Sequence, residues 1–186
     1  VPSVKFYHPT ASEQPVSCQG GEEMTSWFDI TTWRPPGGIG LAEPDKPAGL
    51  EASVKVVHKA LEAAEKAGVP SDRIVIGGFS QGGVVALLAG LSYPRKLGGI
   101  ASISGWATYR DDLASKTNPA NAAVPCIFCS GTGDPVVEFA LSKKSGEVLE
   151  SALGESVSVM QVKRSEHGPH PSEMQAVQAF MIKCLG

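Results

Sequence analysis

Hydrophobic residues follow two different spacings along the 186-residue chain. From Leu50 to Ala64 they recur at steps of three and four residues, which predicts an amphipathic helix that ends near Gly68. Further helices are predicted over residues 81–91, 139–153 and 172–185. Short apolar runs lie between the helices, and continuous runs of this kind are typical of strands buried on both faces. These strands are expected over residues 73–76, 99–103, 124–129 and 157–162, with one more short strand over 4–7.

Strands that alternate with helices indicate an α/β fold with a mostly parallel central sheet and helices on both faces. The chain shows no internal repeat and no linker long enough to separate domains, so residues 1–186 are expected to form one domain. Apolar residues make up 42% of the chain and charged residues 19%, which is ordinary for a globular protein. The net charge is −3 and no basic run occurs, which excludes a nucleic-acid-binding surface. The longest apolar stretch, 84–91, is far shorter than the roughly 20 residues of a membrane span.

The four cysteines are scattered, and only Cys126 and Cys129 form a C-x-x-C pair. This pair lies in a predicted strand, where residues three apart point to opposite faces of the sheet. We therefore expect two separate buried thiols rather than a redox pair or half of a zinc site. Free thiols suit a reducing compartment, so the chain is expected to be cytoplasmic, without a metal or cofactor.

One segment combines a reactive side chain with a recognisable context. Residues 78–82 read Gly-Phe-Ser-Gln-Gly, which fits the pattern G-x-S-x-G. With 21 glycines in the chain the pattern alone is weak, but it lies between a predicted buried strand and a helix of small residues. A sharp turn at this junction would present the hydroxyl of Ser80 above the carboxyl end of the sheet, where open α/β folds place their sites. The segment therefore predicts a nucleophilic serine, the alternative being a serine that merely caps the helix.

A serine hydroxyl needs a base to accept its proton, and the base is usually a histidine oriented by a carboxylate. In this fold class the acid and then the histidine follow the serine along the chain. Only His167 and His170 follow Ser80, and both lie between the last strand and the last helix. Spacing and composition do not separate these two candidates.

Three aspartates are candidates for the acid. Asp134 follows the next-to-last predicted strand within a glycine-rich turn, whereas Asp111 and Asp112 lie in the loop after the preceding strand. The neighbours of Asp111 and Asp112 are polar and typical of a solvated loop. The position after the next-to-last strand favours Asp134.

The chain resembles the acyl-protein thioesterase and carboxylesterase family of α/β-hydrolases. The resemblance rests on motifs at 27–30, 73–83, 133–137, 166–167 and 173–174 and covers nearly the whole chain. The run Gly-Phe-Ser-Gln-Gly-Gly is more specific to this family than G-x-S-x-G alone. The resemblance implies Ser80 as the nucleophile, Asp134 as the orienting acid and His167 as the base. Counting back from 173–174 places the family histidine at His167, which leaves His170 in a variable loop.

The resemblance also implies a chemistry and a substrate class. Family members form an acyl-enzyme on the serine and act on S-acylated proteins, lysophospholipids and small esters. The backbone N–H of Gln81 would stabilise the oxyanion, while Trp106 and Val136 match positions that line the acyl channel. For both channel residues, core packing is an equal alternative. The sequence shows no lipidation motif, so membrane-surface contact would be transient and driven by the substrate.

One departure from the family leaves the site incomplete. The family carries an upstream strand and a His-Gly-Leu-Gly-Asp loop that supplies a second oxyanion N–H, and nothing in this chain matches them. We therefore expect an N-terminally truncated hydrolase fold, with two or three further strands before Val1 in the full gene product. Otherwise the sheet would be completed by rearrangement or by a second copy of the chain in a homodimer. The missing loop also leaves open a non-catalytic relative that binds acyl chains or a partner. A separate alternative is a small-molecule carboxylesterase without activity on lipidated proteins.

Overall fold

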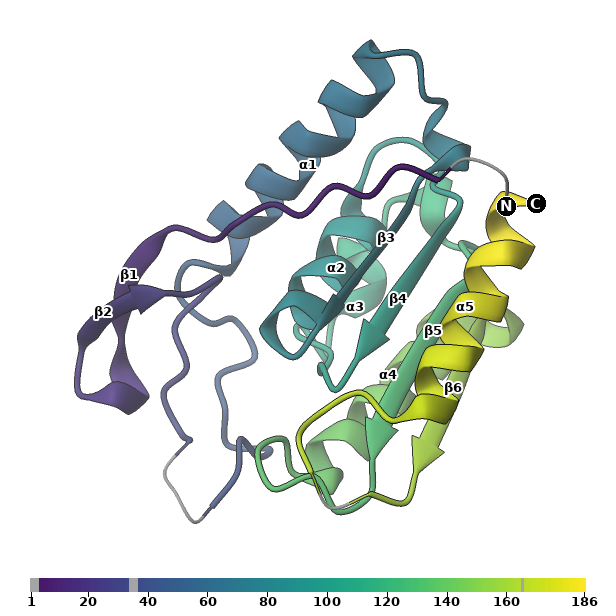
Figure 1. Ribbon diagram of the computed structural model, residues 1–186. Coiled ribbons are helices and arrows are strands. Elements are labelled where there is room, and N and C mark those ends of the chain that lie inside the picture. The colour runs from purple at the N-terminus through teal and green to yellow at the C-terminus, as the bar shows by residue number, and fades with distance from the viewer. Residues whose placement is uncertain (1–3, 34–36, 165) are drawn as a thin grey trace.

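A four-stranded parallel sheet forms the framework of the protein (Figure 1). The computed structural model describes residues 4–33, 37–164 and 166–186. The strands are adjacent in the order β3-β4-β5-β6, which is also their order along the chain. Their bounds are β3 Val75–Phe79, β4 Gly99–Ile103, β5 Cys126–Gly131 and β6 Val157–Val162. All four strands were expected from their apolar runs, although β3 and β5 each begin two residues later than predicted, and β3 extends to the residue before Ser80.

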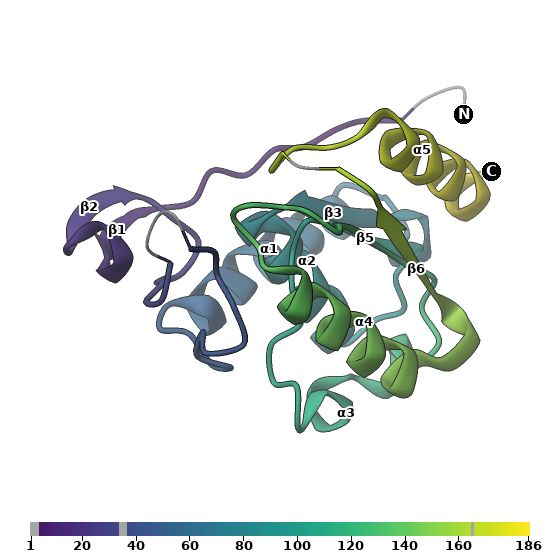
Figure 2. The ribbon, with the colours of Figure 1, turned by 90° about the horizontal axis from the view of Figure 1, so that it is seen from below.

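Helices cover both faces of this sheet, as the alternating pattern predicts (Figure 2). The helix α5 lies on one face, whereas α2 and α4 lie on the other and α1 packs against α2. The short helix α3, which the sequence pattern did not predict, lies on the same side as α2 and α4. The bounds are α1 Leu50–Lys66, α2 Gln81–Ser92, α3 Leu113–Lys116, α4 Phe139–Leu153 and α5 Pro171–Leu185. The expected α/β architecture is therefore confirmed.

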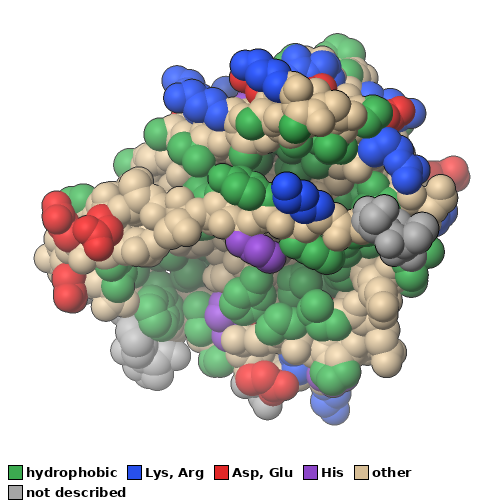
Figure 3. Space-filling model, turned by 45° about the horizontal axis from the view of Figure 1, so that its top comes forward, with side chains coloured by type: hydrophobic (Ala, Val, Ile, Leu, Met, Phe, Trp, Pro, Cys, Tyr) green, Lys and Arg blue, Asp and Glu red, His purple; other side chains and the backbone are tan. Residues whose placement is uncertain are grey.

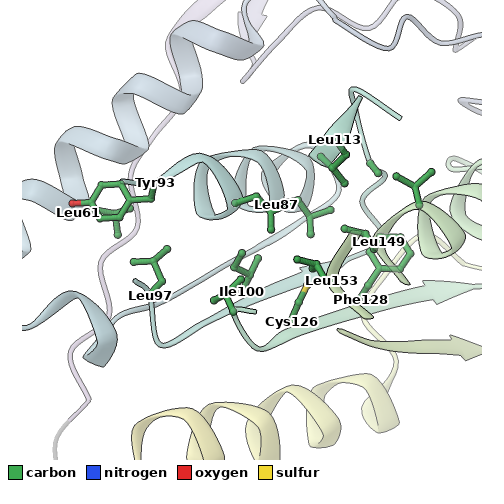
Figure 4. Close-up of a cluster of buried hydrophobic side chains, with 14 residues drawn as sticks. Leu61, Leu87, Tyr93, Leu97, Ile100, Leu113, Cys126, Phe128, Leu149 and Leu153 are labelled. Atoms are coloured by element: carbon green, nitrogen blue, oxygen red, sulfur yellow. The ribbon is translucent and has the colours of Figure 1, made fainter. Parts of the chain in front are cut away.

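The two faces of the sheet bury separate hydrophobic clusters. On the side of α2 and α4, Phe128 and Ile100 pack with Leu149 and other buried side chains (Figure 4). On the side of α5, Ile127 and its neighbours pack against Val177. Because neighbouring residues of a strand point to opposite faces, β5 contributes alternately to both clusters.

The C-x-x-C pair is divided between these two clusters. Cys126 belongs to the cluster under α2 and α4, and Cys129 belongs to the cluster under α5. Both thiols are free and buried, and burial raises the pKa of each to about 12. The prediction of two separate buried thiols is confirmed.

The N-terminal part of the chain departs from the sequence expectation. Residues 4–7 are not part of any strand, so the strand predicted there is wrong. The first strands are instead β1 Glu13–Val16 and β2 Glu22–Thr25, which form an antiparallel pair outside the main sheet. Most of their side chains are exposed and polar, so this pair lacks the apolar alternation by which half-buried strands are recognised. In Figure 3 acidic side chains gather at one end of the molecule, whereas basic, apolar and other side chains are mixed over the rest of that face.

The strand that leads to Ser80 lies at the edge of the sheet. Among the described strands, β3 pairs with β4 alone. Gly77 and Phe79 of this strand are exposed. Further strands that would cover this edge stay a prediction.

Close packing of α2 on β4 depends on one glycine. A Cβ atom on Gly83 would lie 2.6 Å from Ser102 Oγ of β4 and 3.1 Å from the carbonyl oxygen of Gly78. The hydroxyl of Ser102 is buried and has no hydrogen-bond partner among the described residues. The serine hydroxyl is therefore the first obstacle to a larger residue at position 83.

We predict that Gly83→Ala lowers the free energy of unfolding by about 1–3 kcal/mol, because overpacking outweighs the gain in helix propensity of about 1 kcal/mol. In a Ser102→Ala background the same substitution should cost less than half as much, since the clashing oxygen is absent. Urea denaturation of the wild type, the two single variants and the double variant measures the coupling between positions 83 and 102. If Gly83→Ala lowers the free energy of unfolding equally in the two backgrounds, the close contact between α2 and Ser102 of β4 is absent.

Candidate active site

Ser80 occupies the sharp turn between β3 and α2. Its backbone has φ 53° and ψ −124°, a conformation that non-glycine residues rarely adopt. The N–H of Ser80 donates to the carbonyl of Ile103 at 2.9 Å, and its own carbonyl accepts from Gly83 and Val84 in the first turn of α2. A Cβ atom on Gly78 would lie 2.2 Å from the carbonyl group of Gly82, so only glycine fits there. The structure thus shows the tight strand-to-helix turn expected from the motif.

His167 lies between Ser80 and Asp134. Its Nε2 atom is 3.1 Å from Ser80 Oγ, and its Nδ1 atom is 3.0 Å from Asp134 Oδ1 and 2.9 Å from Asp134 Oδ2. The ring of Phe79 lies beside the imidazole, with 4.8 Å between the ring centroids. The His167 side chain is 16% exposed, whereas that of Asp134 is 2% exposed, so the histidine is partly open to solvent and the carboxylate is not. Both imidazole nitrogens are therefore engaged by residues far apart in the sequence.

The carboxylate of Asp134 is held from several directions. Oδ1 accepts from the backbone N–H groups of Val136 at 2.9 Å and Val137 at 3.0 Å, and Oδ2 accepts from Arg164 Nη1 at 3.1 Å. Burial alone would raise the pKa of Asp134. The hydrogen bonds from His167, Val137 and Val136 outweigh that effect and hold the pKa below its usual range. The acid is thus an ionised carboxylate at neutral pH.

The rival histidine has a different role in the structure. His170 is the N-cap of α5: its Nδ1 accepts from the N–H of Ser172 at 3.3 Å, and its own N–H donates to Glu173 Oε2 at 2.7 Å. Ser172 and Gln175 have capping-box spacing in the sequence, but they do not form the cap of this helix. Because α5 begins one residue earlier, at Pro171, the cap and its partner move back to His170 and Glu173.

The rival aspartates are not brought to the site. Asp111 and Asp112 are exposed and border a shallow depression between α3 and α4 together with Lys144 and Glu147. Of the three candidate acids, only Asp134 contacts a histidine that also contacts Ser80.

Gln81 connects the serine turn to the segment before α1. As the first residue of α2, it has a backbone N–H without an intrahelical partner, and this N–H belongs to the residue after Ser80. Its side chain accepts from the N–H of Trp27 at 3.2 Å and donates to the carbonyl of Phe28 at 2.8 Å. The sequence analysis considered only the backbone of Gln81, and the anchoring by its side chain is visible only in the structure.

The two predicted channel residues differ in their surroundings. Trp106 is 0% exposed and packs edge-on against Phe28 in the core, with 5.8 Å between the ring centroids. Val136 is partly buried, and its backbone N–H is one of the groups that hold Asp134. Packing and positioning account for both in this structure, and their contact with an acyl chain stays a prediction.

Three polar residues behind the acid were missed by the sequence analysis. Arg164 is 6% exposed and contacts Asp134, Ser104 and Glu173, and Glu173 is 0% exposed. Arg164 follows a lysine at the end of β6, where charged residues normally point to solvent, so the sequence contains no signal of its burial.

The described residues contain no cluster of side chains that would form a metal site. Over 4–33, 37–164 and 166–186, no group of three or more His, Cys, Asp or Glu side chains could hold a metal ion. Within the same ranges, no helix combines the length and the apolar character needed to cross a membrane.

Comparison with known proteins places this geometry in a family. A model described as phospholipase/carboxylesterase matches residues 1–185. Acyl-protein thioesterase 1 of Gibberella zeae is 36% identical over 186 residues, covering 98% of this chain and 77% of the relative. The crystal structure of Arabidopsis thaliana SOBER1 superposes with a TM-score of 0.85 at 27% identity, over 96% of this chain and 82% of the other. Acyl-protein thioesterase 2 of Zea mays superposes with a TM-score of 0.79 at 27% identity, over 96% and 80%. The chain therefore belongs to the phospholipase/carboxylesterase family of α/β-hydrolases and is a serine hydrolase of the esterase and thioesterase class.

Proposed function

We propose that this chain hydrolyses acyl thioesters or carboxylic esters through a triad of Ser80, His167 and Asp134. The observation that carries the proposal is the position of His167. Its Nε2 atom lies 3.1 Å from the serine hydroxyl, and its Nδ1 atom lies 2.9 Å from the carboxylate. A serine that is merely a helix cap has no need of a histidine oriented in this way. The relatives named for acyl-protein thioesterase activity support acylated proteins as substrates.

The proposed reaction begins with proton transfer from Ser80 Oγ to His167 Nε2 as the oxygen attacks the acyl carbonyl carbon. A tetrahedral oxyanion forms, and the backbone N–H of Gln81 at the start of α2 donates to it. The positive end of the α2 dipole favours the same negative charge. When the carbonyl reforms, the bond to the leaving thiolate or alkoxide breaks, and His167 returns the proton to that leaving group.

Water completes the cycle by the same route in reverse. His167 accepts a proton from a water molecule that attacks the acyl-enzyme, and the carboxylic acid departs as Ser80 regains its proton. Asp134 holds the imidazole in the tautomer whose Nε2 can accept a proton, and its charge stabilises the imidazolium that forms twice per turnover.

An apolar side chain at the site supports an acyl substrate. Phe79 is 38% exposed although it directly precedes Ser80, and its ring lies beside His167. An exposed aromatic ring at this position gives an alkyl chain an apolar contact next to the reacting carbonyl. Depalmitoylation of S-acylated proteins and hydrolysis of lysophospholipids or small esters all fit this contact. Comparing a palmitoyl thioester with a short nitrophenyl ester would separate a thioesterase for lipidated proteins from a small-molecule carboxylesterase.

We predict that a fluorophosphonate probe labels the wild-type protein on the peptide that contains Ser80. Ser80→Ala should abolish the labelling and lower kcat/KM for a nitrophenyl ester by at least about 10³-fold, because the nucleophile is removed. Mass spectrometry locates the adduct, and Ser92→Ala on the far end of α2 serves as the matched control. Folded wild-type protein that resists the probe would instead support a non-catalytic relative that binds acyl chains or a partner.

The two histidines should separate into a chemical and a structural role. We expect His167→Ala to lower kcat/KM by about 10³- to 10⁴-fold with little change in stability, because the general base is lost. His170→Ala should leave kcat/KM within a few-fold of wild type but lower the free energy of unfolding by about 1 kcal/mol, since it removes the N-cap of α5. His170→Asn, which introduces a good N-cap residue, should restore that stability. Ester hydrolysis and urea denaturation measure both effects, and the reverse pattern would make His170 the base.

A further inference from the structure

Three buried charges form a row behind His167. Arg164 Nη1 donates to Asp134 Oδ2 at 3.1 Å, and Arg164 Nε lies 3.3 Å from Glu173 Oε2. The side chains are 2% exposed for Asp134, 1% for Arg164 and 0% for Glu173, so water screens none of these charges effectively. The row runs from the loop after β5, through the end of β6, to the first turn of α5.

The guanidinium of Arg164 is held tightly enough to act as a positioning device. Besides the two carboxylates, it donates from Nη2 to Ser104 Oγ at 2.6 Å and from Nη1 to the carbonyl of Glu166. A planar guanidinium held by three hydrogen-bond acceptors and by an ion pair with Glu173, to which Arg164 Nε makes no hydrogen bond, fixes the direction from which Asp134 Oδ2 is approached. This contact and the N–H donors on Oδ1 together orient the carboxylate towards His167.

This arrangement also creates an electrostatic problem for the proposed reaction. His167 becomes positively charged when it accepts the serine proton, and Asp134 stabilises that charge. The buried guanidinium of Arg164, which contacts the same Oδ2 of Asp134 as His167 Nδ1, opposes it, because like charges in a poorly screened interior repel. With Glu173 ionised the row carries a net charge of −1, which is the charge of a lone aspartate.

We propose that Glu173 is a positioning residue of the hydrolase, whose negative charge offsets that of Arg164 so that Asp134 keeps its stabilising effect on protonated His167. This inference rests on the proposed function of Ser80 and His167. It assigns to Glu173 an electrostatic role in addition to its capping bond with the N–H of His170.

Few other ionisable groups face this row among the described residues. From β5, the Cys129 thiol lies close enough to interact with Glu173 and Arg164, and because burial raises its pKa to about 12 it is neutral in the working range. The loop before α5 carries Glu166 and His170 within three residues of His167 in the sequence, and from β3 the facing side chain is the uncharged Phe79. The charge balance therefore depends chiefly on Asp134, Arg164 and Glu173.

Glu173→Gln tests the charge while keeping the shape, because glutamine retains a carbonyl oxygen that can accept from the N–H of His170. The acid limb of the kcat/KM profile for a nitrophenyl ester should move to lower pH by about half to one unit, since protonated His167 is less stable without Glu173. The plateau of kcat/KM should fall about three- to tenfold because the same positive charge develops during reaction. Glu150→Gln, an exposed site on α4, makes the same change in net charge and should leave the profile unchanged.

Two further variants separate charge from packing. Glu173→Asp keeps the charge but shortens the side chain, so it should lower the rate without moving the acid limb. The double variant Arg164→Met with Glu173→Gln restores the net charge of −1, so its acid limb should return towards that of wild type even though kcat falls with the lost positioning of Asp134. A purely structural role for Glu173 would produce no such return.

Probe labelling of Ser80 distinguishes failure of this inference from failure of the proposed function. The charge-balancing role is wrong and the triad stands if the wild-type protein is labelled and turns over ester while the pH profile of kcat/KM is the same for Glu173→Gln as for the wild type. If the wild-type protein is neither labelled nor active, the proposed function itself is overturned.

Discussion

The rest of the candidate site depends on the contacts that hold the Asp134 carboxylate. The carboxylate receives backbone N–H groups from its own turn, a guanidinium from the end of β6 and the imidazole of His167. Each of these partners comes from a loop at the carboxyl end of the parallel sheet, so the register of β5 and β6 determines whether they meet. Because the buried carboxylate stays ionised through these bonds, it can orient the histidine and stabilise its positive charge.

The serine side of the site depends on a different constraint, the space available where β3 turns into α2. The unusual backbone of Ser80 requires glycine at position 78, and the close approach of α2 to β4 requires glycine at position 83. These contacts place the hydroxyl 3.1 Å from His167 Nε2 and directly before the start of α2. Strain in one residue is thus compensated by packing that the surrounding sheet and helix provide.

The sequence predicted the parts of the fold that have strong periodicity or specific motifs. The four strands of the main sheet, α1, α2, α4 and α5 all carry such patterns, and the serine motif located the strand-to-helix turn at Ser80. The β1–β2 hairpin was missed because its residues are largely polar and exposed, so no apolar pattern marks it. The burial of Arg164 and Glu173 was missed because a charged residue is buried only when its partners arrive from distant segments. His167 and His170 both lie far from Ser80 in the sequence, so only the family resemblance could distinguish between them.

The most direct measurement is the proton NMR spectrum in the far downfield region, where a proton shared between the histidine Nδ1 and a carboxylate resonates. The contact of His167 with Asp134 predicts such a resonance in the wild-type protein. It should disappear in Asp134→Asn and in His167→Ala and persist in His170→Ala. A resonance that survives in Asp134→Asn, or is absent from the folded wild-type protein, would contradict the central role of this carboxylate.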